Sequence, residues 1–326
     1  MHTFAILHVV MPKRKKGFKH QTRQSTITWF IVALAMTVAL APHAAICRWM
    51  LHGWDPYFLS FVRSALAAVI AFPIVIAYRK NLRGRGLVYG LFASVMMSIA
   101  VLSFVVSLSL QDASLVGLIT LFTPLILIYY SAKVNKERVS HQAKIGVTIA
   151  VVGAIIMLGN GFMSGNHGAA FNLVAVLLGF VNCLTYPLAT VYYKKANDQW
   201  VHLIGLIALG LLVSAAMNLV LWLLNGAHVT YQLSAPMIGA LMYIVVVVAV
   251  LGKFLNVRSY EHVGSGVMGS LYYLQSTLAV LIPVIVLHEK IRPAILLGGA
   301  VILLGIWVAQ YHRLAHTNHH QIFHTM

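Results

Sequence analysis

The most demanding chemistry in this sequence belongs to Arg63, which lies within an otherwise apolar run, 57–78. About six residues from the end of a helix, its guanidinium would lie roughly 9 Å deep in a hydrocarbon layer. An unpaired charge in such a layer costs at least about 2.5–3.5 kcal/mol, so something must compensate it. Two interpretations stay open. Arg63 binds a carboxylate or controls a gate, or its side chain reaches polar headgroups or the carbonyls of a broken helix.

Hydroxyl and aromatic side chains recur at helical spacing in two further apolar runs. In 263–287, Tyr272 and Ser276 fall on one stripe, and Thr120 falls on the equivalent stripe of 113–132. Thr123 and Gln275 lie next to these stripes. Such groups either hydrogen-bond a small polar molecule or bridge neighbouring helices, and both interpretations stay open.

A third polar stripe, in 171–193, contains Asn182 and Tyr186, and Pro187 should kink the helix beside it. His43 is a weaker candidate, because a single histidine in an apolar helix more often packs than binds. The candidate binding residues are therefore Arg63, Thr120, Thr123, Asn182, Tyr186, Tyr272, Gln275 and Ser276.

Acidic residues are absent from the interior of every apolar run. The six Asp and Glu residues fall in connecting segments or at the ends of runs, and they are Asp55, Asp112, Glu137, Asp198, Glu261 and Glu289. A site that exchanges protons for lipophilic cations usually needs a buried carboxylate. We therefore do not expect such a site here.

Neither a metal centre nor an enzyme active site is predicted. No histidine is followed by an aspartate at His-x4-Asp spacing, so we expect no catalytic residue and no cofactor. Cys47 and Cys183 lie in or at the edge of apolar runs, where packing is the expected role. Four histidines near the C-terminal end recur at intervals of four, a spacing suited to zinc when helical, but no Cys or acid joins them and we expect no metal there; they are His312, His316, His320 and His324.

The composition shows what must position these residues. Of the 326 residues, 60% are hydrophobic and only 9% are charged, with a mean hydropathy of +0.86. A soluble domain has roughly 25% charged residues, so this chain is a membrane protein. A helix needs about 20 apolar residues to cross the hydrocarbon core, and ten such runs are present. They are 27–46, 57–78, 87–108, 113–132, 145–163, 171–193, 201–224, 235–255, 263–287 and 293–311.

The distribution of basic residues predicts the orientation. The net charge is +17, and 19 of the 23 Lys and Arg residues fall on one side of the ten runs, against three on the other and Arg63 within a run. Basic residues concentrate on the cytoplasmic side of membrane proteins. Both termini are therefore expected in the cytoplasm, and the charge does not indicate nucleic-acid binding. We expect a multi-pass protein of the inner cell membrane, of bacterial type.

An internal repeat links the two halves of the chain. Glu137, Gly146 and Gly153 recur as Glu289, Gly298 and Gly305, each displaced by 152 residues. Five predicted spans separate equivalent points, and because five is odd the halves should be inverted relative to each other. Inverted repeats are the architecture of many alternating-access transporters, with substrate near the midplane. The glycines should allow close helix packing.

These residues resemble the EamA-like branch of the drug/metabolite transporter superfamily. The resemblance rests on Arg63 and on the segments Phe122-Thr123-Pro124, Lys136-Glu137-Arg138 with Gly146, and His288-Glu289-Lys290 with Gly298. It implies an all-α membrane protein with ten helices in a 5+5 inverted repeat that moves small metabolites, often outward. The sequence departs from the family's residue pattern at two places, so the resemblance says less about the substrate than about the fold. Leu40-Ala41 replaces the Trp-Gly pair usual in the first helix, and Ser276 replaces the proline of the second repeat.

The expected organisation is a basic tail (1–26), a first five-helix repeat (27–163), a second repeat (171–311) and a histidine-rich tail (312–326). The preferred hypothesis is export of a small zwitterionic, amino-acid-like metabolite by alternating access. The alternative within this fold is a nucleotide-sugar or carboxylate transporter. An integral membrane transferase or a metal transporter would need catalytic or metal-ligating residues within the spans. The expected partners are the small-molecule substrate and the lipid bilayer.

Overall fold

The computed structural model describes residues 23–135, 145–146, 148–149, 151–153, 155–156, 172–199, 201–255, 259, 265–289, 293, 296–305 and 307–308. The described residues form helices joined by turns, with no strand among them. Glu137 and the histidines of the C-terminal tail lie outside this part of the chain.

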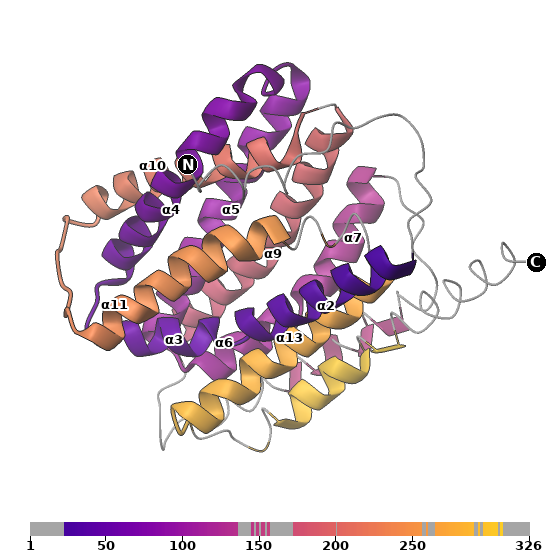
Figure 1. Cartoon of the computed structure of the whole chain (residues 1–326). Helices are drawn as coiled ribbons and strands as arrows, with labels where there is room; N and C mark the ends of the chain where they lie inside the picture. Colours follow the sequence, from indigo (N-terminus) through magenta and orange to yellow (C-terminus); the bar gives the residue numbers. More distant parts are fainter. Residues whose placement is uncertain are drawn as a thin grey trace, which may run out of the picture.

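The described chain forms a bundle of helices (Figure 1). In chain order they are α2 (Arg23–Leu40), α3 (His43–Met50), α4 (Pro56–Tyr78), the 3₁₀ turn η1 (Arg79–Asn81), α5 (Arg85–Leu110), α6 (Ala113–Thr120), α7 (Thr123–Asn135), α9 (Leu173–Asp198), α10 (Leu203–Leu224), α11 (Ala235–Met242), the π-helical η2 (Tyr243–Gly252) and α13 (Ser265–Val286).

Six helical segments of the described chain are long and apolar enough to cross a membrane. They are Ile27–Met50, Pro56–Asn81, Arg85–Leu110, Leu173–Asp198, Leu203–Leu224 and Ala235–Leu255. These correspond to the first, second, third, sixth, seventh and eighth predicted spans. The fourth and ninth predicted spans coincide with α6–α7 and α13, and shorter described helical pieces fall within the fifth and tenth. The count of ten and the 5+5 arrangement stay predictions.

Two predicted spans are broken rather than continuous. The first divides into α2 and α3 at Ala41 and Pro42, and the fourth divides into α6 and α7 at Leu121 and Phe122. Proline lacks the backbone N–H that would bond to the preceding turn, and its ring clashes there. Each break lies beside a proline, Pro42 in one case and Pro124 in the other. Both runs were predicted from the sequence as uninterrupted helices.

The helices pack in pairs that join the two halves of the chain. α5 packs along α9, α4 along α10 and α6 along α13. α13 also lies beside α2, and η2 lies beside α4 (Figure 1). Tyr243 at the start of η2 donates a 2.5 Å hydrogen bond to the carbonyl of Ala39 in α2. Buried clusters therefore include residues from both halves, such as Ile119, Cys183 and Val280 in one cluster.

Glycines bring helix backbones close together at two contacts between the halves of the chain. A Cβ added at Gly153 would lie 2.7 Å from the Gly298 carbonyl oxygen and 2.7 Å from the Ile302 nitrogen. A Cβ added at Gly117 would lie 3.2 Å from the Ala279 carbonyl oxygen. Pieces of the fifth and tenth predicted spans thus meet through Gly153 and Gly298, which belong to the repeated glycine pattern.

Substituting Gly153 tests the importance of this contact. Because backbone atoms surround the position, Gly153→Ala forces the helices apart and should destabilise the protein by about 1–3 kcal/mol. The matched control is Gly239→Ala in α11, where an added Cβ meets nothing within 4 Å. That control should be neutral or stabilising by about 0.4–1 kcal/mol. Thermal unfolding in detergent measures both, and equal melting temperatures for the two variants would contradict the prediction.

Candidate functional site

Arg63 is buried inside the protein. It lies in the second turn of α4, and its side chain is only 6% exposed. Its guanidinium lies beside the Cys47 thiol of α3, within hydrogen-bonding reach, whereas its Nη1 has no hydrogen-bond partner. Both interpretations of Arg63 drawn from the sequence stay predictions.

Two further basic side chains, His43 and Lys253, lie near Arg63, and burial disfavours their charged forms. The charge of Arg63 repels those that His43 and Lys253 would carry. His43 stacks on Phe104 with ring centroids 5.5 Å apart, and its buried Nε2 has no partner. Lys253 lies near the end of the helical segment Ala235–Leu255, which matches a predicted span. Among the residues that the structure describes, no carboxylate forms an ion pair with Arg63.

A second polar cluster joins α4 to α10. The Asn218 amide donates hydrogen bonds to Ser64 Oγ (3.2 Å) and Ser214 Oγ (3.4 Å). Asn218 Oδ1 and the neighbouring Ser60 Oγ are buried without a partner. The sequence analysis missed these residues. Their signal was present, because Ser60 and Ser64 are one turn apart, as are Ser214 and Asn218, in otherwise apolar runs.

Three of the predicted binding residues use their polar atoms within the fold. Thr120 Oγ1 donates to the Gly117 carbonyl (2.6 Å), and Thr123 Oγ1 donates to Cys183 Sγ (3.6 Å). Asn182 Nδ2 donates to the Ala100 carbonyl of α5 (2.8 Å). The contacts of Thr123 and Asn182 bridge helices, as the alternative interpretation anticipated.

The remaining candidates are placed with less detail. Tyr186 is 40% exposed on α9, and Gln275 is partly buried on α13. Tyr272 and Ser276 lie in α13, and their side chains are outside the described set. None of these four has a described contact with Arg63. Their role in binding stays a prediction.

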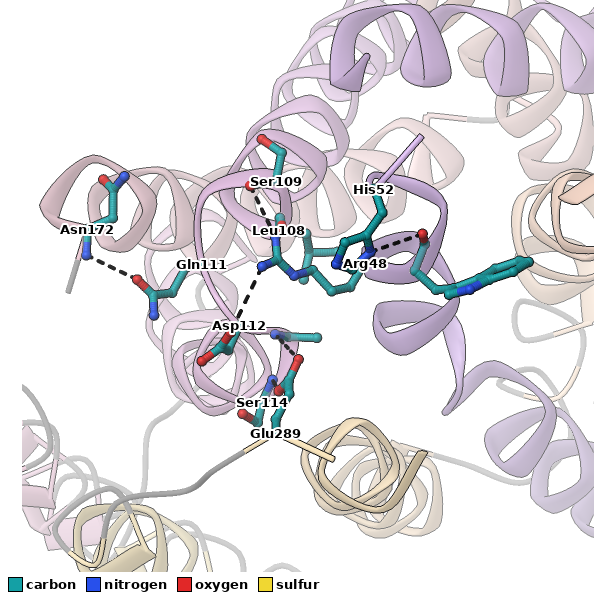
Figure 2. Close-up of polar contacts among 11 residues, drawn as sticks. Arg48, His52, Leu108, Ser109, Gln111, Asp112, Ser114, Asn172 and Glu289 are labelled. Carbon is teal, nitrogen blue, oxygen red and sulfur yellow. Dashed lines mark hydrogen bonds and ion pairs between the residues drawn. The ribbon is translucent and has the colours of Figure 1, made fainter. Parts of the chain in front are cut away.

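A charged network lies at the end of the bundle where α4, α6, α9 and α11 begin, which we call the cap end (Figure 2). Arg48, in the last turn of α3, donates from Nη1 to the Leu108 carbonyl (2.7 Å) and the Ser109 carbonyl (3.1 Å) of α5. Its Nη2 lies 3.9 Å from Asp112 Oδ1. Arg48 thus joins the end of α3 to the connection between α5 and α6.

Glu289 closes the same network from the other half of the chain. Its Oε1 accepts a hydrogen bond from the Ala113 N–H and its Oε2 from the Ser114 N–H, both at 2.8 Å (Figure 2). These are free N–H groups at the first turn of α6, where a carboxylate is favoured by charge-assisted bonding and by the helix dipole. His288 before it has a φ of 53°, which turns the chain after α13. Glu289 therefore connects the two predicted repeats directly.

The surroundings of Asp112 at the cap end disfavour its ionised form. Burial, with the nearby Glu289 carboxylate as a second cause, raises the pKa of Asp112, and Arg48 offsets this only in part. A carboxyl whose pKa is raised in the folded protein is destabilised when ionised. The ionised carboxylate of Asp112 is therefore less favourable in the folded protein than in water.

This architecture agrees with what comparisons with known proteins show. The profile of the EamA-like transporter family matches residues 27–159 and 173–310, one match for each half of the chain. The chain belongs to the EamA-like transporter family. The resemblance inferred from Arg63, Glu137 and Glu289 is thereby confirmed.

Two further likenesses place this EamA-family protein among known relatives. An uncharacterized transporter, YvbV of Bacillus subtilis, is 26% identical over 204 residues, which are 62% of this chain. The match spans 64% of that relative's own length, less than two thirds. A crystal structure 18% identical to this chain superposes with a TM-score of 0.59 over 90% of this chain and 99% of that one. That likeness supports the fold alone.

The raised pKa of Asp112 predicts a pH-dependent stability. Because the folded protein favours the protonated form, the ionised carboxylate lowers stability at pH 7, and this penalty is lost as the pH falls toward about 4. Asp112→Asn should therefore raise the melting temperature at pH 7, with the gain shrinking toward pH 4. Asp198→Asn, outside this network, controls for removal of a carboxylate. A gain at Asp112 that is the same at both pH values would contradict the prediction.

Proposed function

We propose that this transporter moves a small polar metabolite that carries a carboxylate group, with an amino-acid-like zwitterion as the preferred substrate. The observation that supports this most is the state of Arg63, which is buried with Nη1 unpartnered and with no described carboxylate beside it. A buried, unpaired guanidinium is costly. A substrate carboxylate would offset that cost, since the guanidinium fork binds carboxylates in a bidentate way.

The rest of the site fits a substrate without a net positive charge. The interiors of the described spans contain no acid that would bind a cation. An ammonium group of a zwitterion would then bind hydroxyls, carbonyls or aromatic rings, and Thr120, Tyr186, Tyr272, Gln275 and Ser276 remain the proposed contacts.

A carboxylate or nucleotide-sugar substrate is the second candidate. It is supported by two further basic groups near Arg63, His43 and Lys253, which could become charged beside an anion with more than one negative charge. The zwitterion is retained as the first candidate because Arg63 alone satisfies one carboxylate.

Alternating access is proposed as the mechanism because helix pairing follows the inverted repeat. If α4 corresponds to α10 and α6 to α13, exchanging the repeats maps each of these two pairs onto itself. The same exchange converts the pairing of α5 with α9 into that of η2 with α2, and the pairing of α7 with α9 into that of α13 with α2. All of these pairings occur. A structure with this pseudo-symmetry has two related conformations, each open at one end.

We propose that the cap end faces outward and that transport is export. The basic residues gather at the opposite end of the predicted spans, as in Arg79, Lys80, Arg83, Lys194 and Lys195, which supports a cytoplasmic location for that end and for both termini. The described conformation, with Glu289 bound across the repeats, then corresponds to closure on the outer side.

Substituting Arg63 tests the substrate site. Metabolites released by cells with and without the protein identify candidate substrates, and uptake of labelled amino-acid and dicarboxylate mixtures into proteoliposomes then measures transport. Arg63→Met should reduce transport by about 10- to 100-fold, because a charge-assisted hydrogen bond contributes about 1.5–3 kcal/mol. Arg63→Lys should keep part of the activity, since the charge remains but the fork geometry is lost.

The control for this experiment is Arg83→Met, which removes an exposed arginine between α4 and α5. It should leave transport unchanged. Full transport by Arg63→Met at normal expression would refute the proposed role of Arg63. A strong response to dicarboxylates with none to amino acids would select the second candidate substrate class.

A further inference from the structure

We propose that the N-terminus of α6 exchanges its capping group during transport. Glu289 caps it when the two halves of the protein meet at the cap end, and Asp112 caps it when they separate. The exchange makes α6 a two-state element at the outer gate. It rests on the alternating access proposed above.

The other helices that begin at the cap end show what is unusual about α6. Each of three is capped by the side chain of its own N-cap residue: Asp55 accepts from the Phe58 N–H (2.8 Å) in α4, Asn172 from the Ala175 N–H (3.1 Å) in α9, and Ser234 from the Met237 N–H (3.4 Å) in α11. α6 also has a favourable N-cap residue, Asp112, whose side chain caps nothing.

The position of Glu289 explains why Asp112 does not cap its own helix. The Glu289 carboxylate already accepts the N–H groups of Ala113 and Ser114, both at 2.8 Å. A second carboxylate at the same helix end would face it with like charge. The Asp112 side chain instead turns toward Arg48, 3.9 Å away. The like charge of the Glu289 carboxylate therefore disfavours a cap by Asp112 as long as Glu289 stays bound.

Asp112 is prepared to replace Glu289. Its backbone, with φ of −57° and ψ of 141°, already has the extended conformation of an N-cap residue, so rotation of the side chain is sufficient. Arg48 is not left without partners by this rotation, because its Nη1 retains the carbonyls of Leu108 and Ser109. In each state a side chain accepts from the first turn of α6: Glu289 from Ala113 and Ser114, and Asp112 from Ser114 or Leu115.

The exchange lowers the cost of opening the cap end. If Glu289 left and nothing replaced it, N–H groups at the start of α6 would lose their partners, which is unfavourable for groups shielded from water. Ala113 and Ser114 are both buried. A replacement cap by Asp112 lowers the cost of breaking the Glu289 contact. That contact can then form and break as the cap end closes and opens.

Cys47 provides a reporter of opening at this end. The chain has two cysteines, and Cys183→Ser leaves Cys47 as the sole thiol. Cys47 is fully buried, lies beside Arg63 and immediately precedes Arg48. A charged methanethiosulfonate added to the protein in lipid nanodiscs should react with Cys47 only in molecules that have opened, so the labelling rate measures the open fraction.

The first comparison removes the Glu289 contact. In the Cys183→Ser background, Glu289→Ala should increase the labelling rate of Cys47 about 10-fold, the change produced by about 1.4 kcal/mol. Glu289→Gln, which keeps one acceptor oxygen, should give a smaller increase in the same direction. Unchanged labelling in both variants would show that Glu289 does not hold the cap end closed.

The second comparison isolates the replacement cap. Asp112→Asn and Asp112→Ala both remove the charge and the ion pair with Arg48, but asparagine caps helices about as well as aspartate and alanine does not. Labelling should be several-fold slower in Asp112→Ala than in Asp112→Asn, because only the alanine variant lacks a cap for the open state. Equal rates in the two variants would overturn the cap exchange.

Asp55 supplies the matched control. It caps α4 from within that helix and does not contact Glu289, so Asp55→Ala and Asp55→Asn should label Cys47 at equal rates. Folding of every variant is checked by elution as a single species and by its melting temperature. Labelling needs no transported substrate. The ratios of Cys47 labelling rates between paired variants therefore test the cap exchange independently of the role of Arg63. If Arg63→Met transported normally while the labelling-rate ratios were as expected, only the proposed substrate site would be rejected.

Discussion

The constraint on which this structure depends is the absence of water around most of its backbone. Within a hydrocarbon layer every backbone N–H and carbonyl needs a partner in the protein, so the chain must cross as helices and must supply caps wherever a helix starts or breaks. The breaks at Pro42 and before Pro124 expose such groups inside the bundle. The capping side chains at the cap end have the same origin. A buried charge likewise needs a partner in the protein. Arg63 is the exception, because it is buried and its Nη1 has no hydrogen-bond partner.

Much of the fold could be predicted from local sequence, because the apolar length of a helix and the side on which basic residues gather are local properties. The bounds of α4, α5 and α10 follow the predicted runs within about two residues. The cost of a buried arginine also marked Arg63 in advance. The contact between Glu289 and α6 could not be found in this way, since it joins residues far apart in the chain. The helix-bridging contacts of Thr123 and Asn182 had the same limitation, because a polar side chain in a helix can face a neighbour or a substrate.

The two charged regions are connected by adjacent residues of one short helix. Cys47 lies beside Arg63, and Arg48, the next residue, bonds to α5 and lies near Asp112. Only one peptide bond separates the residue that contacts Arg63 from the residue that bonds to the cap end. Binding at Arg63 and the state of α6 have a direct physical route by which to influence each other.

The break at Ala41 and Pro42 affects how this connection is held in place. Because α3 is separated from α2 and has only eight residues, continuous backbone hydrogen bonds from α2 do not fix the direction of its axis. The direction of α3 depends instead on its packing against α5, α6 and α13. The proline thus makes the positions of Cys47 and Arg48 a matter of tertiary packing and not of local helix geometry.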